Sequence, residues 1–367
     1  MREIKLPFLV RLSLVLIAVV IIGYLAKIGQ TILAPLFFSL LMAFLFTPFA
    51  EFFEKKLRFK RGLSTLMSLF ALMTLMLSVT YFFYTQLSAF VDDFPKLQQQ
   101  IVKSAEDLQI WISKTFNVKI NKQIDYINQA LEKLVSSSAV ILGFTLSMFS
   151  TIGGFLVFSF LFFIFILNYR GLLFDFIVNV FHEKHNDRVR TITKETQKIV
   201  KQYIIGLVIQ VILVSIITSI FLSVTHVKYA ILLGVLTGFL NVIPYVGVII
   251  SCIFAVIIAF ATGGASPLIV ALGYVGIHAI DANIILPLVV GSKVKINALF
   301  TFIGLLIGES LWGISGMFLS IPFLAILKII FENVDELKPW GKLLGEPKKK
   351  SRKKYKLTKT IVLEEKE

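Results

Sequence analysis

The stretch Gly238-Phe-Leu-Asn241-Val-Ile-Pro244-Tyr245-Val-Gly247 interrupts a long apolar segment with polar, glycine and proline residues. A second interruption reads Gly304-Leu-Leu-Ile-Gly308-Glu309-Ser310-Leu-Trp312-Gly313-Ile-Ser315-Gly316. The segments that contain them, Tyr229 to Thr262 and Asn297 to Ile330, are each 34 residues long. A straight helix of that length would measure ~50 Å, against a bilayer core of ~30 Å. Each segment is therefore predicted to be two half-helices that meet at a break within the membrane, where irregular backbone needs protein or water beside it.

The composition indicates a membrane protein. Hydrophobic residues make up 57% of the chain and charged residues only 16%, and the mean hydropathy is +0.85. The net charge of +15 comes from basic residues at the ends of apolar segments and in the tail, which is typical of cytoplasmic loops rather than of a nucleic-acid-binding surface. The single cysteine, Cys252, lies in an apolar run and excludes a disulfide framework. These features predict an all-α polytopic membrane protein.

The apolar segments predict about six full spans, with the first span uncleaved and paired with the second in a tight hairpin. The loop of residues 54–62 has five basic residues and one acidic residue, which places this loop and the N-terminus in the cytoplasm. The basic tail is also expected in the cytoplasm. The six spans are predicted at about residues 8–26, 31–50, 63–87, 141–167, 203–224 and 267–289.

The predicted organisation has five parts. Residues 1–90 hold spans one to three, and residues 91–139 form two extracytoplasmic amphipathic helices separated near residues 115–117. Their apolar stripes pack on each other or on the membrane domain, or form a subunit contact or an external gate. Residues 140–202 hold span four and a cytoplasmic helix that runs into span five. Residues 203–331 form the transport core, and residues 332–367 form the basic tail.

The two broken segments can be threaded in two ways. As re-entrant hairpins they leave the loop of residues 291–295, with its two lysines, in the cytoplasm; as kinked spans they give an eight-span protein with that loop outside. The positive-inside rule favours the hairpins. Residues 203–262 and 267–330 then form an inverted repeat of a span followed by a hairpin. Such repeats, with broken helices at their interface, are typical of secondary transporters.

Polar side chains within the predicted spans are the candidates for a cargo or ion pathway, because ionisable groups are costly in hydrocarbon. Asp281 and Glu309 can bind and release a proton or a cation. Asp281 and His278 are three residues apart on one helix face and can also simply pair, while Asn241 can simply cap a half-helix. The candidates are Asn241, His278, Asp281, Asn283, Glu309 and Ser310. The residues expected to shape the two breaks are Pro244, Gly247, Gly308, Gly313 and Gly316.

Other motifs argue against an enzyme. We predict no catalytic residues and no cofactor beyond a coupling Na⁺ or H⁺. His182 and His185 have no supporting ligand spacing, so no metal site is expected. The sequence contains no phosphate-binding Gly-x-x-x-x-Gly-Lys-Ser/Thr loop that would couple the chain to ATP. The basic run of residues 348–359 is expected to contact anionic lipids.

Three blocks in the C-terminal third carry a resemblance to a known family. They are Leu240-Asn241-Val-Ile-Pro244-Tyr245-Val-Gly247, Ile280-Asp281-Ala-Asn283-Ile-Ile-Leu-Pro287-Leu-Val-Val-Gly291 and Leu311-Trp312-Gly313-Ile-Ser315-Gly316-Met317-Phe-Leu-Ser-Ile321-Pro322. In order and spacing the chain resembles the autoinducer-2 exporter family of bacterial permeases. The resemblance implies a homo-oligomeric inner-membrane transporter that exports a small polar metabolite or exchanges sodium for protons. A non-transporting membrane scaffold is the third hypothesis.

Overall fold

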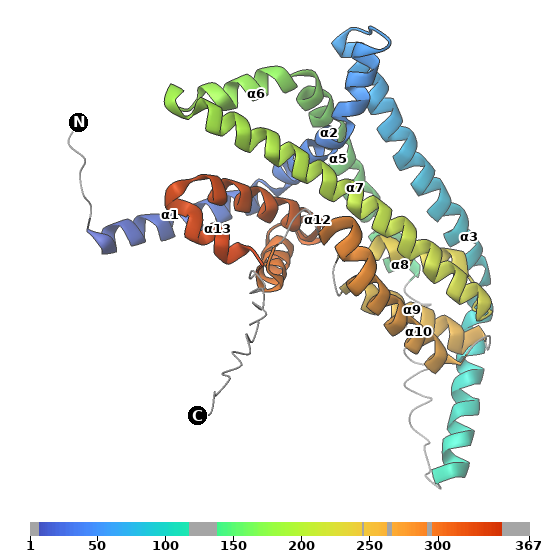
Figure 1. The fold of residues 1–367 in the computed structure, drawn as a ribbon. Helices are drawn as coiled ribbons and strands as arrows, with labels where there is room; N and C mark the ends of the chain where they lie inside the picture. The colour runs from blue at the N-terminus through green and yellow to red at the C-terminus, as the bar shows by residue number, and fades with distance from the viewer. Residues whose placement is uncertain (1–6, 117–137, 244–245, 263–265, 292–295, 347–367) are drawn as a thin grey trace, which may run out of the picture.

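The computed structural model describes residues 7–116, 138–243, 246–262, 266–291 and 296–346. Within these ranges the regular structure is helical (Figure 1), apart from one bridge between Ile296 and Gly345. Short 3₁₀ turns cover Glu183–His185 and Asp335–Leu337, and two π-helical segments cover Asp281–Ile285 and Pro287–Gly291. The α-helices are α1 (Phe8–Ile28), α2 (Gln30–Lys55), α3 (Arg61–Phe116), α5 (Ser138–Asn168), α6 (Arg170–Asn179), α7 (Asn186–Val224), α8 (Ala230–Leu240), α9 (Val246–Thr262), α10 (Pro267–Ile280), α12 (Ala298–Asn333) and α13 (Lys338–Leu344).

The helices confirm the predicted fold class. Six helices in the described ranges are long and apolar enough to cross a membrane, or seven when a bent pair is counted as one span. The bent pair is the end of α5 and α6, which meet at an angle of 70°. Each of the six predicted spans coincides with one of these helices or with α5. The chain is therefore an all-α polytopic membrane protein.

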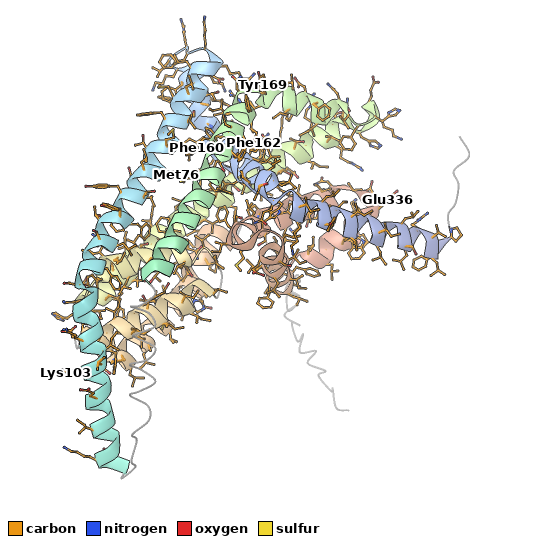
Figure 2. The ribbon with its side chains drawn as sticks, turned by 180° about the vertical axis from the view of Figure 1, so that it is seen from behind. Met76, Lys103, Phe160, Phe162, Tyr169 and Glu336 are labelled. Carbon is orange, nitrogen blue, oxygen red and sulfur yellow. The ribbon has the colours of Figure 1, made fainter. Side chains whose placement is uncertain are left out.

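Two helices are much longer than the ~20 residues that a membrane span needs. α7 is continuous over 39 residues, so the predicted cytoplasmic helix does run into span five. α3 is continuous over 56 residues, so the first predicted extracytoplasmic helix is the extension of span three rather than a separate element. Lys103 lies on this extension, which projects past the other helices (Figure 2). The second predicted amphipathic helix, at residues 120–134, lies outside the described residues.

The first broken segment folds back on itself as α8 and α9. A Cβ atom at Gly247 would lie 1.8 Å from the carbonyl oxygen of Leu240, so the start of α9 packs directly on the end of α8. At the opposite ends of the two helices, Leu233 packs in one buried cluster with Ala255 and Ile258. Because both pairs of ends are close, α8 and α9 form an antiparallel hairpin. Pro244, the proline of this break, lies outside the described residues.

The second broken segment is a hairpin within α12. The helix is interrupted at Trp312 and at Gly313, which has φ 61° and ψ −139°, a conformation that L-residues avoid. A Cβ at Gly316 would lie 1.9 Å from the carbonyl oxygen of Gly308, and a Cβ at Gly304 would lie 2.5 Å from Leu324 Cδ1. Residues before the break therefore lie against residues after it, so the two halves are antiparallel and in close backbone contact.

The tip of this second hairpin lies against the N-terminal helices. Trp312 Nε1 donates a hydrogen bond to the carbonyl oxygen of Ala26 at 2.8 Å, and its ring centroid is 5.7 Å from that of Phe37. The first two spans do not form the expected tight hairpin. A single residue, Gly29, joins α1 to α2, and α1 projects from the other helices with no buried residue (Figure 1).

Two buried apolar clusters hold the remaining helices together. The larger one joins α2, α3, α5, α7 and α12 through residues such as Leu41, Leu72, Phe163, Tyr203 and Leu319. The smaller one joins the end of α7 to α8, α9 and α10. The polar site described next lies on α7, α8 and the end of α10.

Candidate functional site

α7 and α8 meet through small residues. A Cβ at Gly238 would lie 2.1 Å from Ser215 Oγ, and a Cβ at Gly234 would lie 2.0 Å from Ser219 Oγ. The sequence therefore carries a Gly-x-x-x-Gly pattern on α8 facing two serines four residues apart on α7, which is the usual basis of close helix packing in membranes. This close antiparallel packing brings Gln210, five residues before Ser215, beside Asn241, three residues after Gly238.

Asp281 lies where α10 changes to π-helical backbone. The residues that follow it form π-helical turns on both sides of Leu286. Pro287 has no N–H and cannot make the ordinary helical bond to the fourth residue before it, which favours such an irregularity. Short π-helical segments are frequent at functional sites. The Asp281 side chain is buried, with 4% of its surface exposed.

Two side-chain amides hold the Asp281 carboxylate. Gln210 Nε2 donates to Oδ1 at 3.0 Å and to Oδ2 at 3.1 Å. Asn241 Nδ2 donates to Oδ2 at 2.8 Å. Both amides are buried as well. None of the ion pairs found among the described residues involves Asp281, so the carboxylate is stabilised by neutral donors alone.

The amide cage suits a group that changes its charge. An ionised carboxylate accepts hydrogen bonds from the NH₂ groups, as observed. A protonated Asp281 would instead donate its proton to an amide oxygen after Gln210 or Asn241 turned its side chain over. Carboxylate and amide oxygens are also hard ligands suited to a small alkali or alkaline-earth cation. The site can therefore hold a proton or a cation. No positively charged side chain in the described segments is paired with Asp281, so the incoming ion would have none to displace.

The structure does not pair His278 with Asp281. His278 Nδ1 is buried and has no hydrogen-bond partner among the described residues, while both oxygens of Asp281 bond to the amides. Asn283 is exposed and its Nδ2 donates to the carbonyl oxygen of Ala279 at 2.8 Å. The reading of Asp281 as one half of a simple histidine pair is therefore wrong, and Asn283 does not join the cage.

The polar residues of the second break lie apart from the cage. Glu309 and Ser310 are exposed on the first half of α12, close to the turn at Gly313. Neither makes a side-chain hydrogen bond or ion pair within the described ranges. Of the six predicted pathway residues, the structure thus brings two together, Asn241 and Asp281. It leaves the other four outside their hydrogen-bond cluster, namely His278, Asn283, Glu309 and Ser310.

Gln210 is the member of the site that the sequence analysis missed. Gln210 does stand out in the sequence, because an amide side chain in the middle of an apolar span is unusual. The predicted pathway residues all lie in the broken C-terminal segments and in span six, whereas Gln210 belongs to span five. Its partner is 71 residues away in the sequence, so no local spacing connects the two.

The sequence of the chain matches a known protein family. Residues 14–336 match the model of the AI-2E family transporter. The chain belongs to the AI-2E transporter family. It is therefore a multi-pass membrane transport protein, and the resemblance seen in the three sequence blocks is confirmed.

Relatives of this AI-2E family protein match it over most of its length or over about a third. YueF of Bacillus subtilis, which bears the name of a transport protein, is 27% identical over 320 residues, covering 83% of this chain and 86% of YueF. A Thermotoga maritima protein named for transport is 22% identical over 86% of this chain and 91% of its own. The AI-2 transport protein TqsA of Escherichia coli K12 is 33% identical over 113 residues, 30% of this chain and 33% of TqsA.

Proposed function

We propose that this AI-2E family protein is a secondary transporter that works by alternating access, with Asp281 as its ion-binding group. The observation that carries the proposal is the buried Asp281 carboxylate held by Gln210 and Asn241 without a cationic partner. A buried carboxylate is costly unless it is satisfied, and such groups in membrane spans are commonly parts of ion pathways. Binding a proton or Na⁺ would neutralise it, which gives the ion a direct influence on the packing of α7, α8 and α10.

The hairpins supply the parts that move in this proposal. Each has a close glycine contact at its tip region and a break that is not continuous helix. We take both as re-entrant, with the N- and C-termini in the cytoplasm, in the arrangement of an inverted repeat. His278, Asn283, Glu309 and Ser310 are assigned to the rest of the path, which cargo reaches when a hairpin moves. The functional unit is proposed to be a homo-oligomer.

The proposed cargo is a small polar metabolite of the autoinducer-2 type, exported at the expense of an ion gradient. The family description and the name of TqsA support this class of cargo. Sodium/proton antiport is the second candidate, because the Asp281 carboxylate, joined by amide oxygens once Gln210 or Asn241 turns its side chain over, needs no organic substrate to bind a cation.

Everted membrane vesicles that contain the full chain test the proposal. An antiporter gives a sodium-dependent change of internal pH, and an exporter gives ion-driven uptake of autoinducer-2, while intact expressing cells hold less of it. Asp281→Asn should abolish either activity. Asp175→Asn, an exposed aspartate on α6, is the matched control and should be silent.

A different outcome would identify a scaffold. If Asp281→Asn and Glu309→Gln leave the cellular phenotype intact while deletion of residues 91–138 removes it, the protein gathers partners instead of transporting. The threading is tested separately with single cysteines in a Cys252→Ala background. Ser292→Cys should be labelled only from the cytoplasm, and labelling only from outside would replace the hairpins by full spans.

A further inference from the structure

Two hydroxyl groups on α7 are buried and have no hydrogen-bond partner in the part of the chain that the structure describes. They are Ser215 Oγ and Thr218 Oγ1, in side chains that are 8% and 0% exposed. Other hydroxyls of the same helix bond back to their own backbone, as Thr193 does to Val189 and Thr225 to Phe221, both at 2.9 Å. An unsatisfied buried hydroxyl is costly, and water is its usual partner in proteins.

A second pair of hydroxyls lies on the neighbouring helices α8 and α10. Ser215 Oγ points at Gly238 of α8, and the adjacent Thr237 is buried too. Thr237 Oγ1 is 2.6 Å from the carbonyl oxygen of Leu233 and 2.9 Å from Tyr274 Oη of α10. A threonine hydroxyl has one hydrogen, so when Thr237 donates it to Leu233, Tyr274 donates to Thr237. Either hydroxyl can reverse its role.

All four hydroxyls lie on the same side of Asp281. The antiparallel register places Gln210 and Asn241 at the carboxylate, then Ser215 at Gly238, and then Ser219 at Gly234. Tyr274 precedes Asp281 by two turns on α10. This side leads to the α7–α8 turn at residues 225–229. Before the turn, the buried apolar side chains of Leu222, Leu233, Ile258 and Val270 close the seam.

We propose that Ser215, Thr218, Thr237 and Tyr274 line a path that takes up water and conducts protons between Asp281 and the α7–α8 turn. This inference rests on the proposed function, since it supplies the ion to the Asp281 cage. Each hydroxyl or water accepts a proton from one neighbour and releases its own to the next, so the path gains and loses no proton overall. The apolar layer of Leu222, Leu233, Ile258 and Val270 is the barrier that opens during the transport cycle.

Thiol reactivity tests whether the seam holds water. Single cysteines are made as Ser215→Cys, Thr218→Cys and Leu222→Cys in the Cys252→Ala full chain, reconstituted in liposomes under an ion gradient. The reagent is the small cationic thiol reagent MTSEA, which needs a thiolate and therefore an aqueous site. We expect the first two to react about tenfold faster than the cysteine at Leu222. Equal, slow reaction at all three positions would overturn the path.

Isosteric variants test proton conduction in the protein without introduced cysteines. Thr218→Val keeps the shape and removes the hydroxyl, and Thr193→Val is the matched control because that hydroxyl of α7 lies away from the path and is already bonded to backbone. Proton flux should fall about tenfold in the first variant and stay unchanged in the second. A tenfold decrease in rate corresponds to the free energy of about one lost hydrogen bond. Equal flux in both variants would refute a role for Thr218. The two proposals can also be separated. If the cysteines at positions 215 and 218 react fast while Asp281→Asn keeps full transport activity, the proposed function is refuted and the hydrated path is retained.

Discussion

Gln210 Nε2 lies 3.0 Å and 3.1 Å from the two carboxylate oxygens of Asp281, although the residues are 71 positions apart. The amide therefore bridges both oxygens of a buried acid and joins α7 to the irregular end of α10. Asn241 adds one further bond from the end of α8. The carboxylate thus connects three segments of the site, which are α7, the end of α8 and the π-helical turn after α10.

Removing the bridging amide should destabilise the protein. Gln210→Met keeps an unbranched chain of similar length but leaves Asp281 with Asn241 as its donor, and hydrogen bonds to charged groups are worth about 2 kcal/mol. We expect a loss of that size in the free energy of unfolding, measured in detergent. Gln202→Met on the same helix is the control. An equal effect of the two variants would contradict the bridging role.

The two halves of α12 are so close at Gly316 that a side chain at this position should destabilise the protein. In Gly316→Ala the new Cβ would lie 1.9 Å from the carbonyl oxygen of Gly308, so the halves of α12 must separate, at a cost of about 2 kcal/mol or more. Gly276→Ala on α10 has open space around the new atom and should gain stability from its higher helix propensity. Thermal unfolding compares the two, and similar midpoints would argue against a tight hairpin.

Gly313 is expected to be required for a different reason. Nothing lies within 4 Å of a Cβ placed there, but φ is 61°. Gly313→Ala should therefore cost about 1–3 kcal/mol through backbone strain alone, and Trp312 should lose its fixed position at Ala26. Tryptophan fluorescence and thermal unfolding report the change. Unaltered values would mean that the turn can form with ordinary backbone angles.

The extension of α3 is attached to the α7–α8 turn by Tyr229. Its hydroxyl donates to Asp93 Oδ2 at 2.7 Å, and burial, followed by that bond and the negative charge of Asp93, raises the pKa of Tyr229 from 10.0 to about 12. Because the pKa is higher in the folded protein, this contribution to stability is complete below pH 10.0 and disappears as the pH rises through about 12.

Tyr229→Phe removes only the hydroxyl. We expect faster hydrogen–deuterium exchange in the α3 extension near residue 93, equivalent to about 1 kcal/mol of lost local stability. Tyr81→Phe, at an exposed position on the same helix, serves as the control and should leave exchange unchanged. Equal exchange in Tyr229→Phe and the unmodified protein would show that the ring contact with Phe90 suffices.

Much of the molecule was determined by local sequence. Apolar runs of the length of a bilayer predict the spans, because backbone polar groups in hydrocarbon must bond within a helix. The glycines around Gly308 and Gly313 marked the second break, and Asp281 and Asn241 stood out because charge and amide groups are costly in an apolar segment. These inferences need only a residue and its near neighbours.

Tertiary structure alone decided which polar groups meet. The close contacts of Gly234 and Gly238 with two serines set the register of α7 against α8 and bring Gln210 beside Asn241. The packing of the end of α10 on these helices then places Asp281 between the two amides. The same packing places Ser215 Oγ against Gly238. Such contacts depend on the rotation and offset of whole helices, which arise from the summed packing of many side chains, so spacing along the chain does not encode them.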